Sequence, residues 1–399
     1  MDSYNYALSP TSQFYFCGVP FRLDTTPKCD LNCLYCFAMA RGGRRTSRHQ
    51  IANPRSIHFK LQKSVSQKIK RTGIVEEMLS YKYPLHFGGI SDPFSNIMTS
   101  ITSLKLLEIL SNFNYPVVLS TKNTKFLLKD ETMNILKKLK YLVVQVSISI
   151  FSEKTSKAIE PFSPSPKDRI NCINFLSKHG INTMCRLQPL IPIWIDEIGK
   201  DLLPRLGEAG CKHVIVEFLK LPVEKNISLI DNIFNSINWN GYDYYRENKA
   251  TLVGREWLLP NKFRWENLQS IITIIHKHGM TYGAGDYGLN HLGDTDCCCG
   301  IDKIEGFSKW FKYNFSNIIR QSKTKYIRLP KFQNTQCPSK SIAVFMNSKC
   351  RLPKNNTIQN YLATKWNRPG TINAPDTFFG VSWQKEYDND GNCIYYREV

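Results

Sequence analysis

The chain has 399 residues, of which 42% are hydrophobic and 22% charged, so it has room for one large α/β domain and an extension. No apolar run reaches the roughly 18 residues that a membrane span needs, and the first residues lack the pattern of a signal peptide, so neither feature is predicted. The formal net charge of +20 favours a polyanionic partner such as nucleic acid, although a Lys-rich, AT-biased proteome would give the same excess.

Short apolar runs alternate with helix-period segments along most of the chain. The predicted strands are Tyr83–Phe87, Pro116–Ser120, Leu142–Ile150, Asn182–Leu190, His213–Leu219 and Thr281–Ala284. The predicted helices are Ser100–Asn112, Glu131–Leu139, Lys167–Lys178, Glu197–Ala209 and Trp265–His278. This alternation implies an α/β fold with parallel strands, closed as a partial or complete TIM-like (β/α) barrel. An open doubly wound sheet is the competitor, but no Gly-x-Gly-x-x-Gly follows the first strand.

The two ends of the chain complete this organisation. A first strand is expected near Gln13–Leu23, and the barrel core is expected to occupy residues 1–290. Within it, Leu221–Pro260 is rich in aromatic residues and interrupts the repeat, so it is interpreted as an insertion. Residues 291–399 lose the alternation and are interpreted as a Cys-containing C-terminal extension. A Gly-containing loop near the end predicts a hairpin of Val381–Tyr387 and Cys393–Val399.

Three cysteines follow the expected first strand in a Cys-x3-Cys-x2-Cys run, Cys29, Cys33 and Cys36. Three thiolates can hold three irons of a [4Fe–4S] cluster and leave the fourth iron without a protein ligand. An open coordination position is typical of catalytic rather than structural metal sites. Zinc is the alternative, but it takes four ligands, and no second Cys-x2-Cys or His-x3-His pair occurs. Thirteen cysteines, an odd number, suit a reducing cytosol, so we expect a cytoplasmic protein.

The cysteine run, with the aromatic Tyr35 just before its third cysteine, resembles the cluster motif of radical S-adenosylmethionine (SAM) enzymes. The resemblance implies that the open iron chelates the amine and carboxylate of SAM. It also implies that one electron cleaves SAM to a 5'-deoxyadenosyl radical, which abstracts hydrogen from a substrate. A reductase, flavodoxin or ferredoxin is the electron donor that such chemistry requires.

Further segments narrow the resemblance. Gly88-Gly89 ends a predicted strand, where radical SAM proteins carry a Gly-Gly-Glu-type segment, but here Ile-Ser-Asp-Pro follows the glycines. The Ser91–Phe94 segment is similar to that of spore photoproduct lyase and its photolyase-like relatives. Three later segments match the same group in order, over roughly residues 20–220: Ser120-Thr121-Lys122-Asn123, Ile159-Glu160-Pro161 with Arg169, and Arg186-Leu187-Gln188-Pro189 with Ile191-Pro192.

The resemblance implies a cofactor site that extends over several strand ends. Its expected members are Tyr35, Gly88, Gly89, Ser91, Asp92, Lys122, Ser147, Ser149 and Arg186. Ser147 and Ser149 would contact the ribose or carboxylate of SAM, or are simply small polar residues on a strand.

Lys122 and Arg186 would bind the SAM carboxylate, for which an arginine fork is well suited. Alternatively, either cation forms a structural ion pair inside the barrel, with Glu160 or Glu217 as partner.

A basic loop follows the cysteine run and contains Arg41, Arg44, Arg45 and Arg48. Gly42-Gly43 predicts a flexible loop that could grip phosphates, although charge runs are usually solvated surface. We therefore prefer a nucleic-acid base as the substrate, in repair or modification, and a duplex base would have to flip out. A peptide or small metabolite, or a non-catalytic nucleic-acid-binding protein, are the alternatives.

A second cysteine group, Cys297-Cys298-Cys299, lies in the C-terminal part of the chain. Adjacent side chains are not expected to converge easily on one metal. Two of them, with Cys337 and Cys350, could form a second Fe–S or zinc site. By resemblance to spore photoproduct lyase, Cys298 or Cys299 could instead donate a hydrogen atom in catalysis. The remaining alternative is a group of buried thiols.

Overall fold

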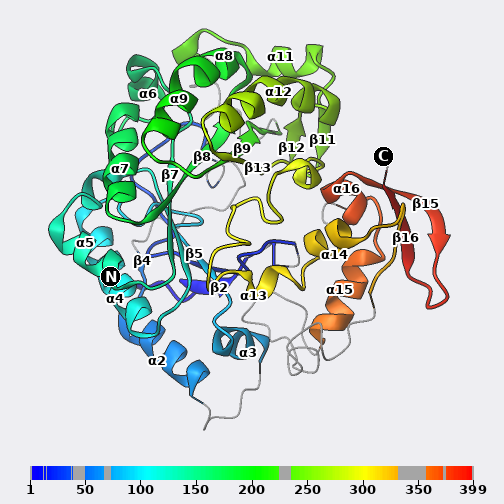
Figure 1. The fold of residues 1–399 in the computed structure, drawn as a ribbon, viewed down its shortest axis with the longest axis horizontal. Coiled ribbons are helices and arrows are strands. Elements are labelled where there is room, and N and C mark those ends of the chain that lie inside the picture. The colour runs from blue at the N-terminus through cyan, green and yellow to red at the C-terminus, as the bar shows by residue number, and fades with distance from the viewer. Residues whose placement is uncertain are drawn as a thin grey trace.

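The computed structural model shows an α/β fold built around one large sheet (Figure 1). It describes residues 2–11, 13–14, 16–36, 38, 50–66, 73–223, 235–330, 356–371 and 374–397. The basic loop residues Arg41, Arg44, Arg45 and Arg48 lie outside the described residues, as do Cys337 and Cys350.

The central sheet has eight strands in the order β13-β9-β8-β7-β6-β5-β3-β2. Seven of them run parallel, and β2 pairs antiparallel with β3. Their bounds are β2 Leu8–Pro10, β3 Phe21–Leu23, β5 Leu85–Phe87, β6 Val117–Thr121, β7 Leu142–Ser147, β8 Asn182–Leu190, β9 His213–Phe218 and β13 Thr281–Ala284. No pairing joins β13 to β2 in the described part of the chain, so of the two predicted forms, partial and complete, the barrel is partial.

Helices connect successive strands and lie around the sheet in Figure 1. Their bounds are α2 Pro54–Val65, α3 Ile74–Ser80, α4 Ile97–Asn112, α5 Asp130–Lys138, α6 Glu153–Ile159, α7 Pro166–Lys178, α8 Ile195–Glu197, α9 Leu203–Glu208 and α12 Asn261–Lys277. Shorter turns are η1 Thr124–Phe126, η2 Pro192–Trp194, the π-type η3 Ile198–Leu202 and η5 Asn290–Leu292. In the described chain, no helix is both long and apolar enough to cross a membrane.

Most predicted elements are confirmed within one to four residues, because continuous apolar runs mark strands that are buried on both faces. β8 and β13 have the predicted bounds. In β7, every residue before Ser147 is buried. The first strand is shorter than the predicted Gln13–Leu23, since only Phe21–Leu23 pairs with its neighbours. Residues before it form turns, closed by the bonds that the Phe16 and Cys17 amides donate to the Gln13 carbonyl.

Smaller sheets and helices complete the chain. Between β9 and α12 lie β10 Leu221–Pro222, α11 Gly241–Glu247, β11 Thr251–Val253 and β12 Glu256–Leu258, and the three strands form one small sheet. β1 Asp2–Ser3 pairs with β4 Gln50–Ile51. After β13 come α13 Ser308–Phe311, α14 Phe315–Gln321, β14 Tyr326–Ile327, α15 Ile358–Trp366, α16 Pro375–Phe379, β15 Val381–Tyr387 and β16 Cys393–Arg397. The predicted C-terminal hairpin is confirmed as the antiparallel pair β15–β16. The division at residue 290 stays a prediction.

The chain after β13 fills the open side of the barrel. It crosses the space between β13 and β2 in Figure 1. On one side, the Asp294 amide donates to the Tyr282 carbonyl of β13 at 3.0 Å. On the other, Trp310 donates its indole N–H to the Phe14 carbonyl at 3.2 Å, and its ring stacks on Phe14 with centroids 5.3 Å apart. We call residues 294–316 the closing segment.

Candidate active site

The three cysteines of the predicted cluster lie on the loop after β3, at the C-terminal ends of the parallel strands. The Cys36 amide donates to the Cys33 carbonyl at 3.1 Å, which curls the loop into a turn. Leu31 is buried beneath it, and Asn32 adopts a left-handed φ of 49° that asparagine tolerates. The Leu34 amide donates to the Ile159 carbonyl at 3.0 Å and ties the loop to the end of α6. The thiols are therefore held at the face where barrel enzymes place their chemistry.

The thiols of this loop are half-buried. Burial, followed by the nearby Asp92 carboxylate, raises the pKa of Cys29 to about 12. Burial also raises the pKa of Cys33 to about 11, although Lys122 opposes the shift. Without a metal these two groups are neutral at pH 7. Because metals bind the thiolate, cluster assembly must release these protons and will be favoured at higher pH.

A buried ionic network clamps the cluster loop to the barrel. Lys122, directly after β6, donates from Nζ to the Tyr35 hydroxyl and to Glu160 Oε1, both at 2.9 Å. The Tyr35 hydroxyl also donates to Glu160 Oε1. Arg169 of α7 pairs with Glu160 Oε2 and donates to the Ser147 carbonyl at 2.8 Å. The network therefore joins the cysteine loop, β6, β7 and α7 through one carboxylate.

The pH dependence of stability should report on this network. Burial alone would raise the pKa of Glu160, but Arg169 and Lys122 hold it at about 2, below its ordinary value of 4.5. The unfolded chain thus takes up this proton at higher pH than the folded chain. The contribution of Glu160 should be complete above pH ~4.5 and lost as the pH falls toward about 2.

The measurement is the melting temperature in steps from pH 5 to pH 2, for the wild type and Glu160→Gln. The difference between the two proteins isolates Glu160 from the other carboxyls, and it should shrink steadily as the pH falls. A difference that stays constant across this range would contradict the assignment.

A second carboxylate fixes the strand ends beside the loop. Asp92 is buried, and burial raises its pKa although backbone bonds oppose the shift. It accepts bonds from the Lys122 amide at 2.5 Å, from the Phe94 amide at 2.8 Å and from the Thr121 hydroxyl at 2.9 Å. The buried Ser91 donates its hydroxyl to the Thr26 carbonyl. Ser91 and Asp92, both predicted as cofactor-site residues, therefore organise the turn after β5 in this structure.

Gly88 and Gly89 end β5 next to the cysteine loop. Gly88 has a φ of +88°, and a Cβ atom there would lie 2.4 Å from the Ser120 carbonyl oxygen. A Cβ at Gly89 would make ordinary van der Waals contacts, the nearest at 3.6 Å to Arg22 and His86. Without side chains, the backbone of this turn permits close approach, and the predicted contact with a ligand stays a prediction.

The predicted residues of β7 and β8 occupy different depths of the barrel. Ser149 is buried and neighbours the Tyr35 hydroxyl, whereas Ser147 offers its carbonyl to Arg169. Arg186 donates to His86 Nε2 at 3.3 Å and to Gln145 Oε1 at 3.2 Å. Of the two ion-pair alternatives, Lys122 therefore pairs with Glu160, and Arg186 binds neutral partners inside the barrel.

His86 of β5 is a member of this interior layer that the sequence did not single out. Burial, followed by repulsion from Arg186, lowers its pKa to about 3. Arginine has no hydrogen-bond acceptor, so it must be the donor in this pair. His86 Nε2 therefore accepts the hydrogen bond and carries no proton. Arg169 was also left without a role, and Glu160 was considered only as an ion-pair partner, although both belong to the sequence segments that carry the resemblance.

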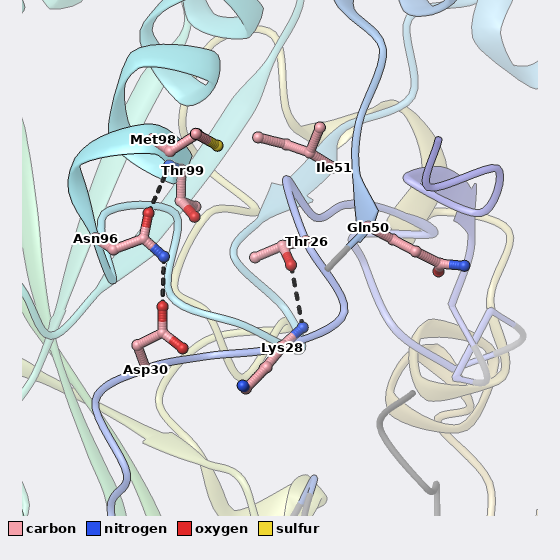
Figure 2. A pocket seen from close by; sticks show the side chains of 8 residues that line it. All are labelled: Thr26, Lys28, Asp30, Gln50, Ile51, Asn96, Met98 and Thr99. Atoms are coloured by element: carbon pink, nitrogen blue, oxygen red, sulfur yellow. Dashed lines mark hydrogen bonds between the residues drawn. The ribbon is translucent and has the colours of Figure 1, made fainter. Parts of the chain in front are cut away.

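Figure 2 shows a small pocket beside the cysteine loop. Its lining residues are Thr26, Lys28, Asp30, Gln50, Ile51, Asn96, Met98 and Thr99. Asn96 begins α4 as its N-cap, accepts from the Thr99 amide at 2.8 Å, and donates its side-chain amide to Asp30 (Figure 2). One side chain thus caps a helix and restrains the residue next to Cys29.

Replacing Asn96 with alanine should lower the free energy of unfolding by about 1 kcal/mol, because both the cap and the bond to Asp30 are lost. Asn96→Ser retains an oxygen that can cap α4 and should recover most of this stability. Urea unfolding at neutral pH measures both variants. Equal losses in the two variants would show that the helix cap is not the source of the effect.

The second cysteine group lies away from the first. Cys297 and Cys299 pack against Val118, Val143 and other residues from the N-terminal halves of the strands. His213, the first residue of β9, donates from Nε2 to the Cys298 carbonyl at 2.9 Å. The predicted catalytic residues Cys298 and Cys299 are therefore placed at the opposite end of the barrel from the cysteine loop.

The expectation that three adjacent cysteines diverge is wrong. Their sulfur atoms all lie within 4.8 Å of one another, close enough for one metal ion. The reason is a tight turn, closed by the bond that the Gly300 amide donates to the Cys297 carbonyl at 2.8 Å. Gly300 permits the turn with a φ of +63°, and the curled backbone gathers the three side chains on one side.

Comparison with known proteins finds one family model and two curated relatives. The Radical SAM superfamily model matches residues 23–203. A curated relative named Radical SAM Nalpha-GlyT isomerase, from Pseudomonas phage M6, is 24% identical over 266 residues, which cover 64% of this chain and 51% of the relative. Uncharacterized protein MJ0683 of Methanocaldococcus jannaschii is 30% identical over 116 residues, which cover 29% of this chain and 43% of the relative. The chain spans about half the length of the curated relatives it matches.

Similar solved structures include a spore photoproduct lyase mutant and SuiB of Streptococcus suis. The first has a TM-score of 0.48 and 14% identity, and the match covers 62% of this chain and 71% of the other. SuiB bound to S-adenosylmethionine has a TM-score of 0.38 and 15% identity, with 59% of this chain and 50% of the other covered.

The three-cysteine loop at the strand ends has the donor set that can hold three irons of a [4Fe–4S] cluster. The matched segment, residues 23–203, is similar to the radical SAM superfamily. That superfamily implies a [4Fe–4S] cluster, SAM and an electron donor.

Proposed function

We propose that Cys29, Cys33 and Cys36 hold a [4Fe–4S] cluster whose open iron binds SAM. The observation that supports this proposal is the position of the three thiols, on one curled loop at the C-terminal ends of parallel strands. The donor set fits the group, because thiolates bind such clusters and three of them leave one iron open. When bound, the cluster and SAM supply the electron transfer and the 5'-deoxyadenosyl radical.

The remaining residues would bind and orient these groups. Gly88 and Gly89 have no side chains, so their backbone could approach the methionine part of SAM. The clamp of Tyr35, Lys122 and Glu160 restrains the loop that carries the thiols. Lys122 is already paired with Glu160, so in this proposal it positions the cysteine loop. Any attraction that Lys122 exerts on the SAM carboxylate is weakened by its ion pair with Glu160. Such binding and orientation are the protein's part in radical chemistry.

The proposed substrate is a nucleic-acid base, which is repaired or modified in DNA or RNA. The support for this class is the net charge of +20, which favours association with phosphates. A base within a duplex would have to leave the stack to reach a radical formed at the end of a barrel. A peptide or small metabolite is the competing substrate class, and binding measurements separate the two.

The chemistry is tested by anaerobic reconstitution with iron and sulfide, followed by dithionite and SAM. We expect about four irons per chain on the first cysteine group and formation of 5'-deoxyadenosine. The triple variant Cys29→Ala, Cys33→Ala, Cys36→Ala should lose both, whereas Cys172→Ala, a buried thiol of α7, should retain both. A complete cluster that never yields 5'-deoxyadenosine would overturn the proposed activity.

The substrate class is tested by the affinity for single-stranded and duplex oligonucleotides across a salt series. Phosphate contacts predict that log Kobs falls linearly with log salt, with a slope of about −0.7 to −0.9 per contact. Negligible affinity with no salt dependence would sink the nucleic-acid proposal and leave the proposed SAM cleavage intact.

A further inference from the structure

The second cysteine group has the spacing of a mononuclear metal site. The sulfur atoms of Cys297, Cys298 and Cys299 lie within 4.8 Å of one another, and those of Cys298 and Cys299 are 3.9 Å apart. In a tetrahedral zinc site with Zn–S bonds of about 2.3 Å, the sulfur atoms are about 3.8 Å apart. Cysteines that bind different irons of a cubane cluster lie farther apart. The observed spacing therefore favours one ion over a cluster.

A fourth thiol reaches the same place from the N-terminal part of the chain. Cys17 packs against this group, and its thiol interacts electrostatically with that of Cys299. Gly18 fits so closely that a Cβ atom there would lie 2.8 Å from Cys297 Sγ. The Cys17 sulfur lies outside the 4.8 Å group of the other three, but the turn before β3 places this thiol beside them, so it could supply the fourth ligand that a closed structural site uses.

The surroundings suit an anionic metal–thiolate centre. Arg186 and His86 interact electrostatically with Cys299 from the barrel interior. Arg320 interacts with Asp296 first and then with Cys297 and Cys298, and its Nε is a buried donor without a hydrogen-bond partner among the described residues. Four thiolates around a divalent ion carry a net charge of −2, which Arg186 and Arg320 oppose, although Arg320 also faces Asp296.

The packing around the turn is fixed by further contacts. A Cβ at Gly283 would lie 2.1 Å from the Cys298 carbonyl oxygen, so β13 approaches the turn as closely as a backbone can. His213 anchors the same carbonyl through Nε2, and its Nδ1 accepts from the Thr281 hydroxyl at 2.8 Å. The thiols are therefore presented by a turn held on both sides, which is the preorganisation that metal binding needs.

We propose that Cys17, Cys297, Cys298 and Cys299 bind a single soft divalent ion, with zinc as the natural occupant. The ion fastens the closing segment to the turn before β3 and so secures the open side of the barrel. It is independent of the cluster proposed at Cys29, Cys33 and Cys36, and its role is structural because four protein ligands leave no open position.

The test uses the full-length triple variant Cys29→Ala, Cys33→Ala, Cys36→Ala, so that metal on the first group cannot contribute. Titration with cobalt(II) under anaerobic conditions should give thiolate-to-cobalt absorption that ends at one ion per chain. Elemental analysis after zinc addition and desalting should likewise find about one zinc. Chelation of the ion should lower the melting temperature, because binding stabilises only the folded chain.

Two further substitutions in that background locate the ion. Cys298→Ser removes a ligand from the turn, and Cys17→Ser tests the fourth ligand at a half-buried position that should tolerate it. Each should weaken zinc binding by at least the ~10–100-fold that loss of a supporting partner costs. Cys393→Ser, in the C-terminal hairpin, is the control and should bind zinc like its parent.

Three outcomes overturn the proposal. The first is a parent variant that is folded by circular dichroism yet gives no thiolate–cobalt absorption. The second is about four irons with sulfide on the second cysteine group, which would mean a cluster instead of one ion. The third is unchanged zinc affinity in both ligand variants. If Cys298→Ser fails to fold, the cobalt spectrum of the parent variant can still refute the proposal.

Discussion

Replacing Glu160 with glutamine is expected to lower the free energy of unfolding by about 3–5 kcal/mol, the largest loss among the side-chain changes considered. The substitution keeps the shape and removes the charge that Lys122 and Arg169 share. Glu160 is 1% exposed and Arg169 is fully buried, so water cannot solvate the cations in place of the lost carboxylate charge. Two buried cations would then face each other without an anion. Urea unfolding at pH 7 measures the effect.

Glu153→Gln on α6 is the matched control, because Glu153 is exposed and its removal should cost about 0.5 kcal/mol or less. The Glu160 variant should also lose iron from the reconstituted cluster more rapidly, since Tyr35 of the cysteine loop shares the same carboxylate oxygen. Equal stability of the two variants would mean that the Glu160 carboxylate is not the anion that compensates these cations.

The parts of the fold that sequence could predict are those set by local patterns. Strands such as β9 are marked by a continuous apolar run and helices such as α7 by a periodic pattern with capping residues, and their bounds were predicted closely. The first strand was overestimated because Gln13–Val19 is also apolar, and only its turn bonds distinguish it from a strand. Local composition does not encode that difference.

Candidate-site residues could be predicted from sequence where neighbouring residues form a motif, as in the cysteine run and the Gly88-Gly89 turn. Contacts between residues that are distant in sequence could not be chosen from sequence alone. The choice of Glu160 as the partner of Lys122 depends on the approach of α6 to the end of β6. The convergence of Cys17 with Cys297 depends on a closing segment 280 residues away in sequence. Such packing follows from tertiary structure, and no periodicity signals it.

Replacing Gly88 with alanine is the second change with a large expected effect, a loss of about 4 kcal/mol in the free energy of unfolding. The φ of +88° is costly for any residue with a side chain, by about 1–3 kcal/mol. The new Cβ would also lie 2.4 Å from the Ser120 carbonyl oxygen and 2.8 Å from Pro93 Cδ. Because both neighbours belong to the packed strand ends, neither can move freely, and overpacking adds about 1–3 kcal/mol.

Gly89→Ala is the control for this turn, since its φ is not in the left-handed region and its Cβ would make only ordinary contacts from 3.6 Å. Its free energy of unfolding should stay within about 0.5 kcal/mol of the wild type. Guanidinium unfolding of both variants makes the comparison. If SAM approaches this backbone as proposed, Gly89→Ala should nevertheless weaken SAM binding, measured by equilibrium dialysis of the reconstituted protein. Equal stability of the two alanine variants would contradict the strained turn on which this geometry depends.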